Sequence, residues 1–295
     1  MSFSVYNGFR DLCFNLRFTD SELDTIRYRY HAITLRVNKD YYSSESDTSH
    51  SLYVGSYGRS TEISSSDIDM LVELPNSVYW KYNDYSGNGQ SALLQDVKNV
   101  LSKTYSNSVV KADGQIISID FADGINFEVL PAFLNKDGES FTFANTNAGG
   151  SWKVTNPRAE IKAVKDLNDE SNGNYRRLCR MAREWRDYNN VDISGILIDI
   201  LAYNFIRDWK YKKNSFTYYD WMTRDFFKYV SNVPVTQSSW KVMGSNRFIT
   251  CNGYFQNKAK DAYNISLEAI SDEKEYPYVA NKEWRQIYGK RFPLL

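Results

Sequence analysis

Two aspartates lie two residues apart in an apolar segment, Asp67 and Asp69 in Asp-Ile-Asp-Met-Leu-Val. Alternate residues of a β-strand point to the same face, so a strand here presents both carboxylates together and buries the apolar residues. Two like charges about 4 Å apart repel by about 4 kcal/mol at an effective dielectric near 20. Divalent cations relieve such repulsion, and paired Mg²⁺ ions drive phosphoryl and nucleotidyl transfer. The pair therefore predicts a metal site, against the alternative of a solvated strand edge.

A small glycine-rich segment precedes this strand, and it begins with Gly55-Ser56. A tight turn with no side chain in the way lets backbone N–H groups and the Ser56 hydroxyl approach phosphate oxygens. Alone, a Gly-Ser pair also fits an ordinary turn. Followed by Asp67 and Asp69, it predicts a cradle for the β- and γ-phosphates of a nucleotide.

A third carboxylate would complete the metal site, and two residues compete for that place. In residues 125–133 the apolar side chains of Phe127 and Val129 share one face, so Glu128 faces the other way. A tight hairpin at Asp123-Gly124 would place Glu128 opposite Ser118, with Asp120 diagonally close. We favour Glu128, with Asp120 as the rival.

Composition excludes several classes of protein. The 295 residues contain 36 Lys and Arg against 36 Asp and Glu, and this zero net charge argues against a protein that grips long duplex nucleic acid. Three widely spaced cysteines and two histidines indicate neither a disulfide framework nor a zinc site. No stretch resembles a signal peptide or a membrane span, so we expect a cytoplasmic protein.

Apolar periodicity predicts the elements that must position these residues. We expect a mixed sheet with helices in residues 1–150, although the N-terminal helices can belong to either lobe, and a mainly helical lobe in residues 151–295. Polar segments 76–90 and 135–158 are expected to be loops. The expected strands are 52–54, 66–74, 108–111, 115–121 and 125–133, and the expected helices are 6–16, 19–37, 91–101, 159–167, 175–188, 194–205, 221–230 and 258–270.

Together, these residues resemble the DNA polymerase β-type nucleotidyltransferase superfamily: Gly-Ser, then Asp-x-Asp, then an acid in a later strand. More specifically, residues 50–210 resemble the bacterial cGAS/DncV-like nucleotidyltransferases of CBASS antiphage defence. Their local sequence is most similar to that of the CdnG clade. The further matching segments are Gly149-Gly150-Ser151-Trp152, Thr155-Asn156-Pro157, the helix from Leu178 to Trp185, and Ser194-Gly195-Ile196-Leu197-Ile198.

The resemblance implies an α+β fold: a polymerase β-like core, a helical second lobe and an active site in the cleft between them. It also implies that Arg183, two residues before the helix tryptophan, and Ser194, at the start of the next helix, hold the donor triphosphate. Arginine in place of lysine suits phosphate, and Ser194 is equally compatible with a plain N-cap. Glu128 departs from the aspartate that is commoner in the family.

The implied activity is synthesis of a cyclic di- or oligonucleotide from NTPs, with two Mg²⁺ ions (Mn²⁺ as a substitute) held by Asp67, Asp69 and Glu128. One ion positions the donor triphosphate, and the other activates the acceptor 2′- or 3′-hydroxyl for in-line attack. The alternatives are a transferase acting on a tRNA end, a protein or a small molecule, and a nucleotide-binding regulator on an inactive core. We expect purine NTPs as substrates, a separate effector protein for the product, no membrane, DNA or RNA partner, and a monomer.

Overall fold

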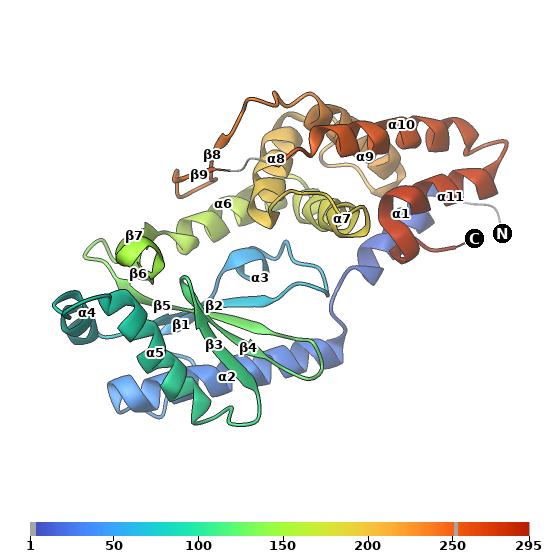
Figure 1. Cartoon of the computed structure of the whole chain (residues 1–295). Coiled ribbons are helices and arrows are strands. Elements are labelled where there is room, and N and C mark those ends of the chain that lie inside the picture. The colour runs from blue at the N-terminus through green and yellow to red at the C-terminus, as the bar shows by residue number, and fades with distance from the viewer. Residues whose placement is uncertain (1–3, 251–252, 295) are drawn as a thin grey trace. The chain divides into compact units, whose positions relative to one another are not determined.

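The protein is described by a computed structural model that covers residues 4–250 and 253–294 (Figure 1). Its contacts divide the chain into two compact units. The sheet unit comprises residues 18–59 and 65–161, and the helical unit comprises residues 4–17, 60–64 and the chain from residue 162 onward. The N-terminal helix thus belongs to the helical unit.

The sheet unit is built on a seven-stranded mixed sheet with β1-β2-β5-β4-β3 as its main order. β2 and β5 run parallel, whereas β1 lies antiparallel to β2 and β4 lies antiparallel to β5. β6 pairs with the far half of β5, and β7 pairs with β6. The strands are β1 (Ser51–Tyr53), β2 (Ile68–Glu73), β3 (Val109–Asp113), β4 (Ile116–Asp120), β5 (Phe127–Leu134), β6 (Phe141–Asn145) and β7 (Ser151–Thr155).

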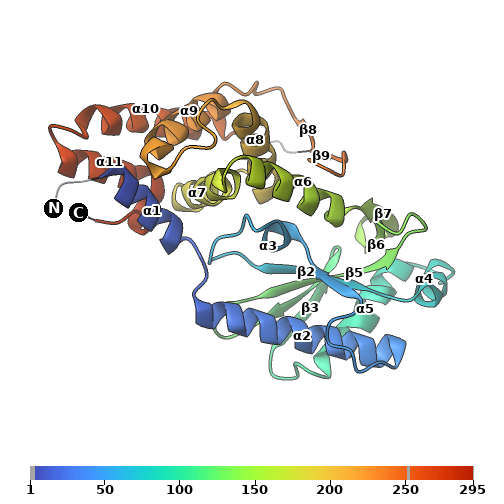
Figure 2. The same cartoon turned by 180° about the vertical axis from the view of Figure 1, so that it is seen from behind.

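Two helices, α2 (Asp20–Tyr42) and α5 (Gly89–Ser102), pack together against one face of the sheet, as Figures 1 and 2 show. α2 begins at a capping box in which Thr19 and Glu22 satisfy each other's backbone N–H groups. Ile68, Met70 and Phe127 point into the core that these helices cover. Because strand residues alternate, Asp69 and Glu128 face the other side, where the short helix α3 (Gly55–Arg59) contacts β2.

The helical unit encloses an aromatic core. Phe9 of α1 makes edge-to-face ring contacts with Tyr219, Trp284 and Phe292, and all four rings are buried. This core ties the N-terminal helix to helices near the end of the chain. The helices are α1 (Val5–Asn15), α6 (Pro157–Glu170, which begins in the sheet unit), α7 (Asn174–Tyr188), α8 (Gly195–Asp208), α9 (Tyr219–Ser231), α10 (Gln256–Asp272) and α11 (Pro277–Tyr288).

The predicted mixed sheet with helices and the helical second part are confirmed, but the loops predicted at residues 76–90 and 135–158 are wrong. Residues 76–90 contain α4 (Asn76–Asn83), a helix too short for its period to be evident. Residues 135–158 contain β6 and β7, which extend the sheet to residue 155, so the division falls after residue 161 and not at residue 150. The small hairpin of β8 (Ser239–Lys241) and β9 (Phe248–Thr250) was also not predicted.

Two of the three cysteines lie in the described part of the chain. Cys13 and Cys179 are free and buried, and Cys251 lies outside the described residues. Within the described chain, no helix combines the length and the apolar character that crossing a bilayer requires.

Candidate active site

Asp69 and Glu128 are brought together by the parallel pairing of β2 with β5. In this register Asp69 is the direct partner of Glu128, and across the next strand Ser118 is the partner of Glu128. The predicted hairpin geometry is therefore confirmed. Asp67 lies just before β2, next to Ile68, the first strand residue, and its side chain is exposed.

The acids of this cluster lie close together, and Asp69 and Glu128 are partly buried; both features shift the pKa values of these two residues. Burial, and then the charges of Asp69 and Asp67, raise the pKa of Glu128 to about 7. Burial also raises the pKa of Asp69, against the charge of Arg59, a backbone N–H of Ser56 and a side-chain hydrogen bond with Glu128. The hydrogen bond between the two side chains raises the pKa of Glu128 and lowers that of Asp69, so a proton in this pair is favoured on Glu128. A cation entering here would displace that proton.

Gly55 allows the backbone to approach this cluster. Its φ is +58°, and a Cβ at this position would overlap the carboxylate of Asp69. The residue must therefore be glycine for two separate reasons. The predicted turn is in fact the first residue of α3, whose next N–H, that of Ser56, bonds to Asp69. Gly55 and Ser56 thus lie beside the acids, as a phosphate cradle requires.

A buried ion pair near the acid cluster was not predicted from the sequence. Arg59, the last residue of α3, is 6% exposed and pairs with buried Glu160 of α6 at 3.4 Å. Its charge favours the ionised form of Asp69. Arg59 itself could have been noticed in the sequence, because it follows Gly55-Ser56 by only three residues. Its partner Glu160 could not, because it lies 101 residues further along the chain.

Asp120, the rival third acid, lies at the end of β4, where its carboxylate pairs with Lys111 of β3 at 3.5 Å. Both side chains are well exposed, and Asp120 is the strand partner of Val109. Its carboxylate is thus engaged on the β3 side, whereas Glu128 touches Asp69. This geometry favours Glu128.

Arg183 and Ser194 belong to the helical unit. Arg183 of α7 is buried, with its guanidinium 2.5 Å from the Asp199 carboxylate and 3.1 Å from the Gly195 carbonyl oxygen. Thr61 donates a second hydrogen bond to Asp199. This network gives Arg183 a structural role at the start of α8, and its phosphate contact stays a prediction.

Ser194 is the N-cap of α8, and its exposed hydroxyl accepts a 3.4 Å hydrogen bond from the Leu197 N–H. The N-cap interpretation of Ser194 thus agrees with the structure. Because an exposed N-cap leaves neighbouring backbone N–H groups open to an anion, the phosphate interpretation remains compatible with it.

The acid cluster is suited in its donor chemistry to Mg²⁺. Within residues 4–250 and 253–294, no three His, Cys, Asp or Glu side chains form a ready-made metal cage. Mg²⁺ rarely uses such cages, because it commonly takes one or two carboxylates together with substrate phosphates and water. Asp67, Asp69 and Glu128 supply oxygen ligands only, beside a glycine cradle, and this set fits the ion.

The family follows from comparison with known proteins. The model of the Second Messenger Oligonucleotide or Dinucleotide Synthetase domain matches residues 1–168, which is more than half of the chain. The chain belongs to this family. The family resemblance found in the sequence is thereby confirmed.

Two curated relatives match this chain at low sequence identity. A probable cyclic nucleotide synthase of Bacillus cereus is 26% identical over 183 residues, covering 57% of this chain and 51% of the relative. The match thus spans about half the length of that protein. A cyclic AMP-AMP-AMP synthase of an Acinetobacter species is 21% identical over 255 residues, covering 83% of this chain and 73% of the relative.

Solved structures support the fold. The di-nucleotide cyclase DncV of Vibrio cholerae, in a complex with ATP and GTP, superposes with a TM-score of 0.75 at 15% identity, covering 97% of this chain and 95% of that one. E. coli CdnC with ATP gives 0.69 at 16% identity, covering 98% of both chains. CdnG of Bradyrhizobium diazoefficiens with GTP gives 0.67 at 10%, covering 97% and 98%. These scores do not single out the CdnG clade.

Proposed function

We propose that this chain joins NTPs into a cyclic di- or oligonucleotide and releases pyrophosphate. The observation that carries the proposal is the contact between Asp69 and Glu128 beside Gly55, in a chain of the second-messenger synthetase family. Nucleotidyl transfer needs clustered carboxylates next to a phosphate cradle, and it asks little covalent work of the protein.

Each residue of the site has a task in this proposal. The Gly55 backbone and the Ser56 hydroxyl would orient the donor triphosphate, because the Ser56 N–H already bonds to Asp69, and Arg183 and Ser194 are proposed to assist. Asp67, Asp69 and Glu128 would hold Mg²⁺, which neutralises phosphate charge and lowers the pKa of the attacking hydroxyl. The charge of Arg59, which also pairs with Glu160, favours the ionised form of Asp69 that would coordinate a cation.

Several finer points of function rest on the relatives. ATP and GTP accompany the DncV structure, GTP accompanies the CdnG structure, and the Acinetobacter relative is named for an all-adenine product. This favours purine NTPs as substrates. A CdnC structure is described as a complex with a HORMA protein. We extend the proposal to antiphage signalling through a separate effector, in a protein that acts in the cytoplasm as a monomer.

The decisive experiment is mass spectrometry of the product formed by the whole chain from all four NTPs, with Mg²⁺ and with Mn²⁺. A cyclic, phosphatase-resistant product supports the proposal, and its mass gives ring size and bases. The Asp67→Ala plus Asp69→Ala variant is the control and should form none. Product that requires an added tRNA, protein or small molecule would establish the alternative transferase. NTP binding without turnover under either metal would indicate an inactive regulator.

A further inference from the structure

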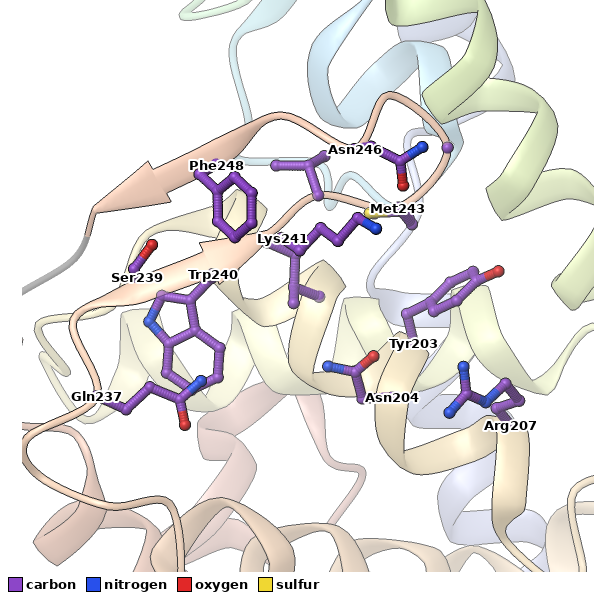
Figure 3. A pocket seen from close by; sticks show the side chains of 13 residues that line it. Tyr203, Asn204, Arg207, Gln237, Ser239, Trp240, Lys241, Met243, Asn246 and Phe248 are labelled. Atoms are coloured by element: carbon purple, nitrogen blue, oxygen red, sulfur yellow. The ribbon is translucent and has the colours of Figure 1, made fainter.

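A pocket of about 500 Å³ lies within the helical unit, between α8 and the chain segment that carries β8 and β9. Figure 3 shows Tyr203, Asn204 and Arg207 on α8 facing the segment from Gln237 to Phe248. The volume lies in the range of small-molecule sites, about 300–1,000 Å³. None of the acid-cluster residues lines this pocket.

Three aromatic side chains line the pocket: Tyr203, Trp240 and Phe248. Trp240 and Tyr203 also pack in the core of the helical unit, whereas the ring of Phe248 is exposed. Phe248 is 69% exposed, and within the described chain neither it nor Trp240 contacts another ring. Trp240 is 4% exposed, and its indole Nε1 has no hydrogen-bond partner among the described residues. Buried donors are almost always paired, so the unpaired indole N–H of Trp240 is an exception among the described residues.

The polar lining completes the chemistry. The side-chain amides of Asn204, Gln237 and Asn246 offer donors and acceptors, which is the combination that the edge of a nucleobase needs. Arg207 and Lys241 are both exposed, and no residue lining the pocket is acidic. Asp208 pairs with Arg207 only loosely, at 3.6 Å between exposed groups. The charge of the pocket is therefore positive, which favours an anionic ligand.

We propose that this pocket of the helical unit, which no acid-cluster residue lines, is a further ligand site that binds a nucleoside phosphate. The rings would stack on the base, the amides would meet its edge, and Arg207 and Lys241 would pair with phosphate. An inorganic anion would leave the rings unused, and an apolar ligand would leave the amides and cations unpaired. The same chemistry suits a mononucleotide or a cyclic nucleotide product, so the test must separate these two sources.

The test measures binding of ATP and of cyclic di-AMP by calorimetry, without divalent metal, to the whole chain carrying Asp67→Ala and Asp69→Ala. This background prevents turnover and weakens binding at the acid cluster. The pocket variant adds Arg207→Ala and Lys241→Ala, and its matched control adds Lys258→Ala and Lys260→Ala, two exposed cations on α10. All four positions are exposed, so none is expected to disturb folding.

We expect at least one probe to bind the background and the control equally. The pocket variant should bind about tenfold more weakly or worse, because two charge-assisted contacts are lost. Binding of ATP alone identifies a mononucleotide site, and binding of cyclic di-AMP alone identifies a product site. Phe248→Ala, which removes only an exposed ring, should weaken binding about fivefold or more.

Two results would overturn the proposal: no binding of either probe to the background at millimolar concentration, or equal binding to the pocket and control variants. Photo-crosslinking with 8-azido-ATP gives an independent measurement. It should label peptides from α8 or from residues 237–248, and labelling confined to the sheet unit would count against the pocket. Because the test measures binding to a background that lacks Asp67 and Asp69, and not synthesis, failure here leaves the proposed synthesis untouched.

Discussion

Glu128 of β5 is the direct strand partner of Asp69 of β2, and their two carboxyl side chains are joined by a hydrogen bond. Two acids in adjacent parallel strands, 59 positions apart, thus meet at one point of the sheet. The helix α3 lies beside this pair. Its first two residues approach Asp69, and the charge of its last residue, Arg59, acts on Asp69.

Loss of the acids should remove activity while leaving the fold. Asp67→Ala plus Asp69→Ala, and separately Glu128→Gln, should lower the rate of pyrophosphate release from NTPs by about 10³-fold or more, because carboxylate ligands for Mg²⁺ are lost. Asp120→Asn, its exposed rival, should change the rate by less than about threefold. Pyrophosphate release and circular dichroism measure the two properties. A stronger loss with Asp120→Asn than with Glu128→Gln would reassign the third ligand.

Gly55→Ala should be far more damaging than Gly114→Ala. Both glycines have nearly the same positive φ, +58° and +57°, so both substitutions carry about 1 kcal/mol of backbone strain. Only at Gly55 does the new Cβ overlap Asp69, whereas at Gly114 nothing lies within 4 Å. We expect activity to fall about 100-fold or more for Gly55→Ala and to be retained for Gly114→Ala. Equal activity of the two variants would show that the close approach is unimportant.

Arg183→Met should destabilise the helical unit by about 3–5 kcal/mol, because it leaves the Asp199 carboxylate buried without its cation. Adding Asp199→Asn removes that charge and should restore about 1 kcal/mol or more. The measurement is the free energy of unfolding in urea. Arg10→Ala, which breaks an exposed ion pair with Asp11, is the control and should cost less than about 0.5 kcal/mol. Equal costs for Arg183 and Arg10 would rule out the structural role.

Glu273→Gln should stabilise the protein at pH 8 and not at pH 4. Burial, and then the charge of Asp220, raise the pKa of Glu273 to about 8 from an ordinary 4.5. The folded protein therefore keeps this proton longer than the unfolded chain does, so its contribution to stability falls as pH rises from about 4.5 to about 8. Glutamine has no such loss, and the gain at pH 8 should be on the order of 1 kcal/mol, since the group is only partly buried.

The measurement for Glu273 is the urea unfolding curve of both proteins at several pH values. Glu268→Gln, an exposed change on α10, serves as the control and should give a difference that stays flat with pH. A flat difference for Glu273→Gln as well would mean that its carboxyl titrates normally.

The sequence predictions that succeeded rest on local rules of secondary structure. Alternation placed Ile68 and Met70 in the core and Asp69 on the opposite face, and the capping box at Thr19 marked the start of α2. The Asp123-Gly124 turn located β5 and the register of Glu128 against Ser118. Each of these features depends on residues close together in the chain, so the printed sequence already contained them.

Contacts between distant segments had to come from the tertiary structure. The parallel pairing of Asp69 with Glu128, the burial of Arg59 against Glu160 and of Arg183 against Asp199, and the docking of α1 among the last helices each join residues from 16 to nearly 300 positions apart. No local period encodes such pairings, because they depend on which surfaces fill each other's space. The sequence by itself determined the acids, the glycine cradle and the family. Tertiary packing decided which third acid meets Asp69, gave Arg183 its buried ion pair and formed the pocket beside α8.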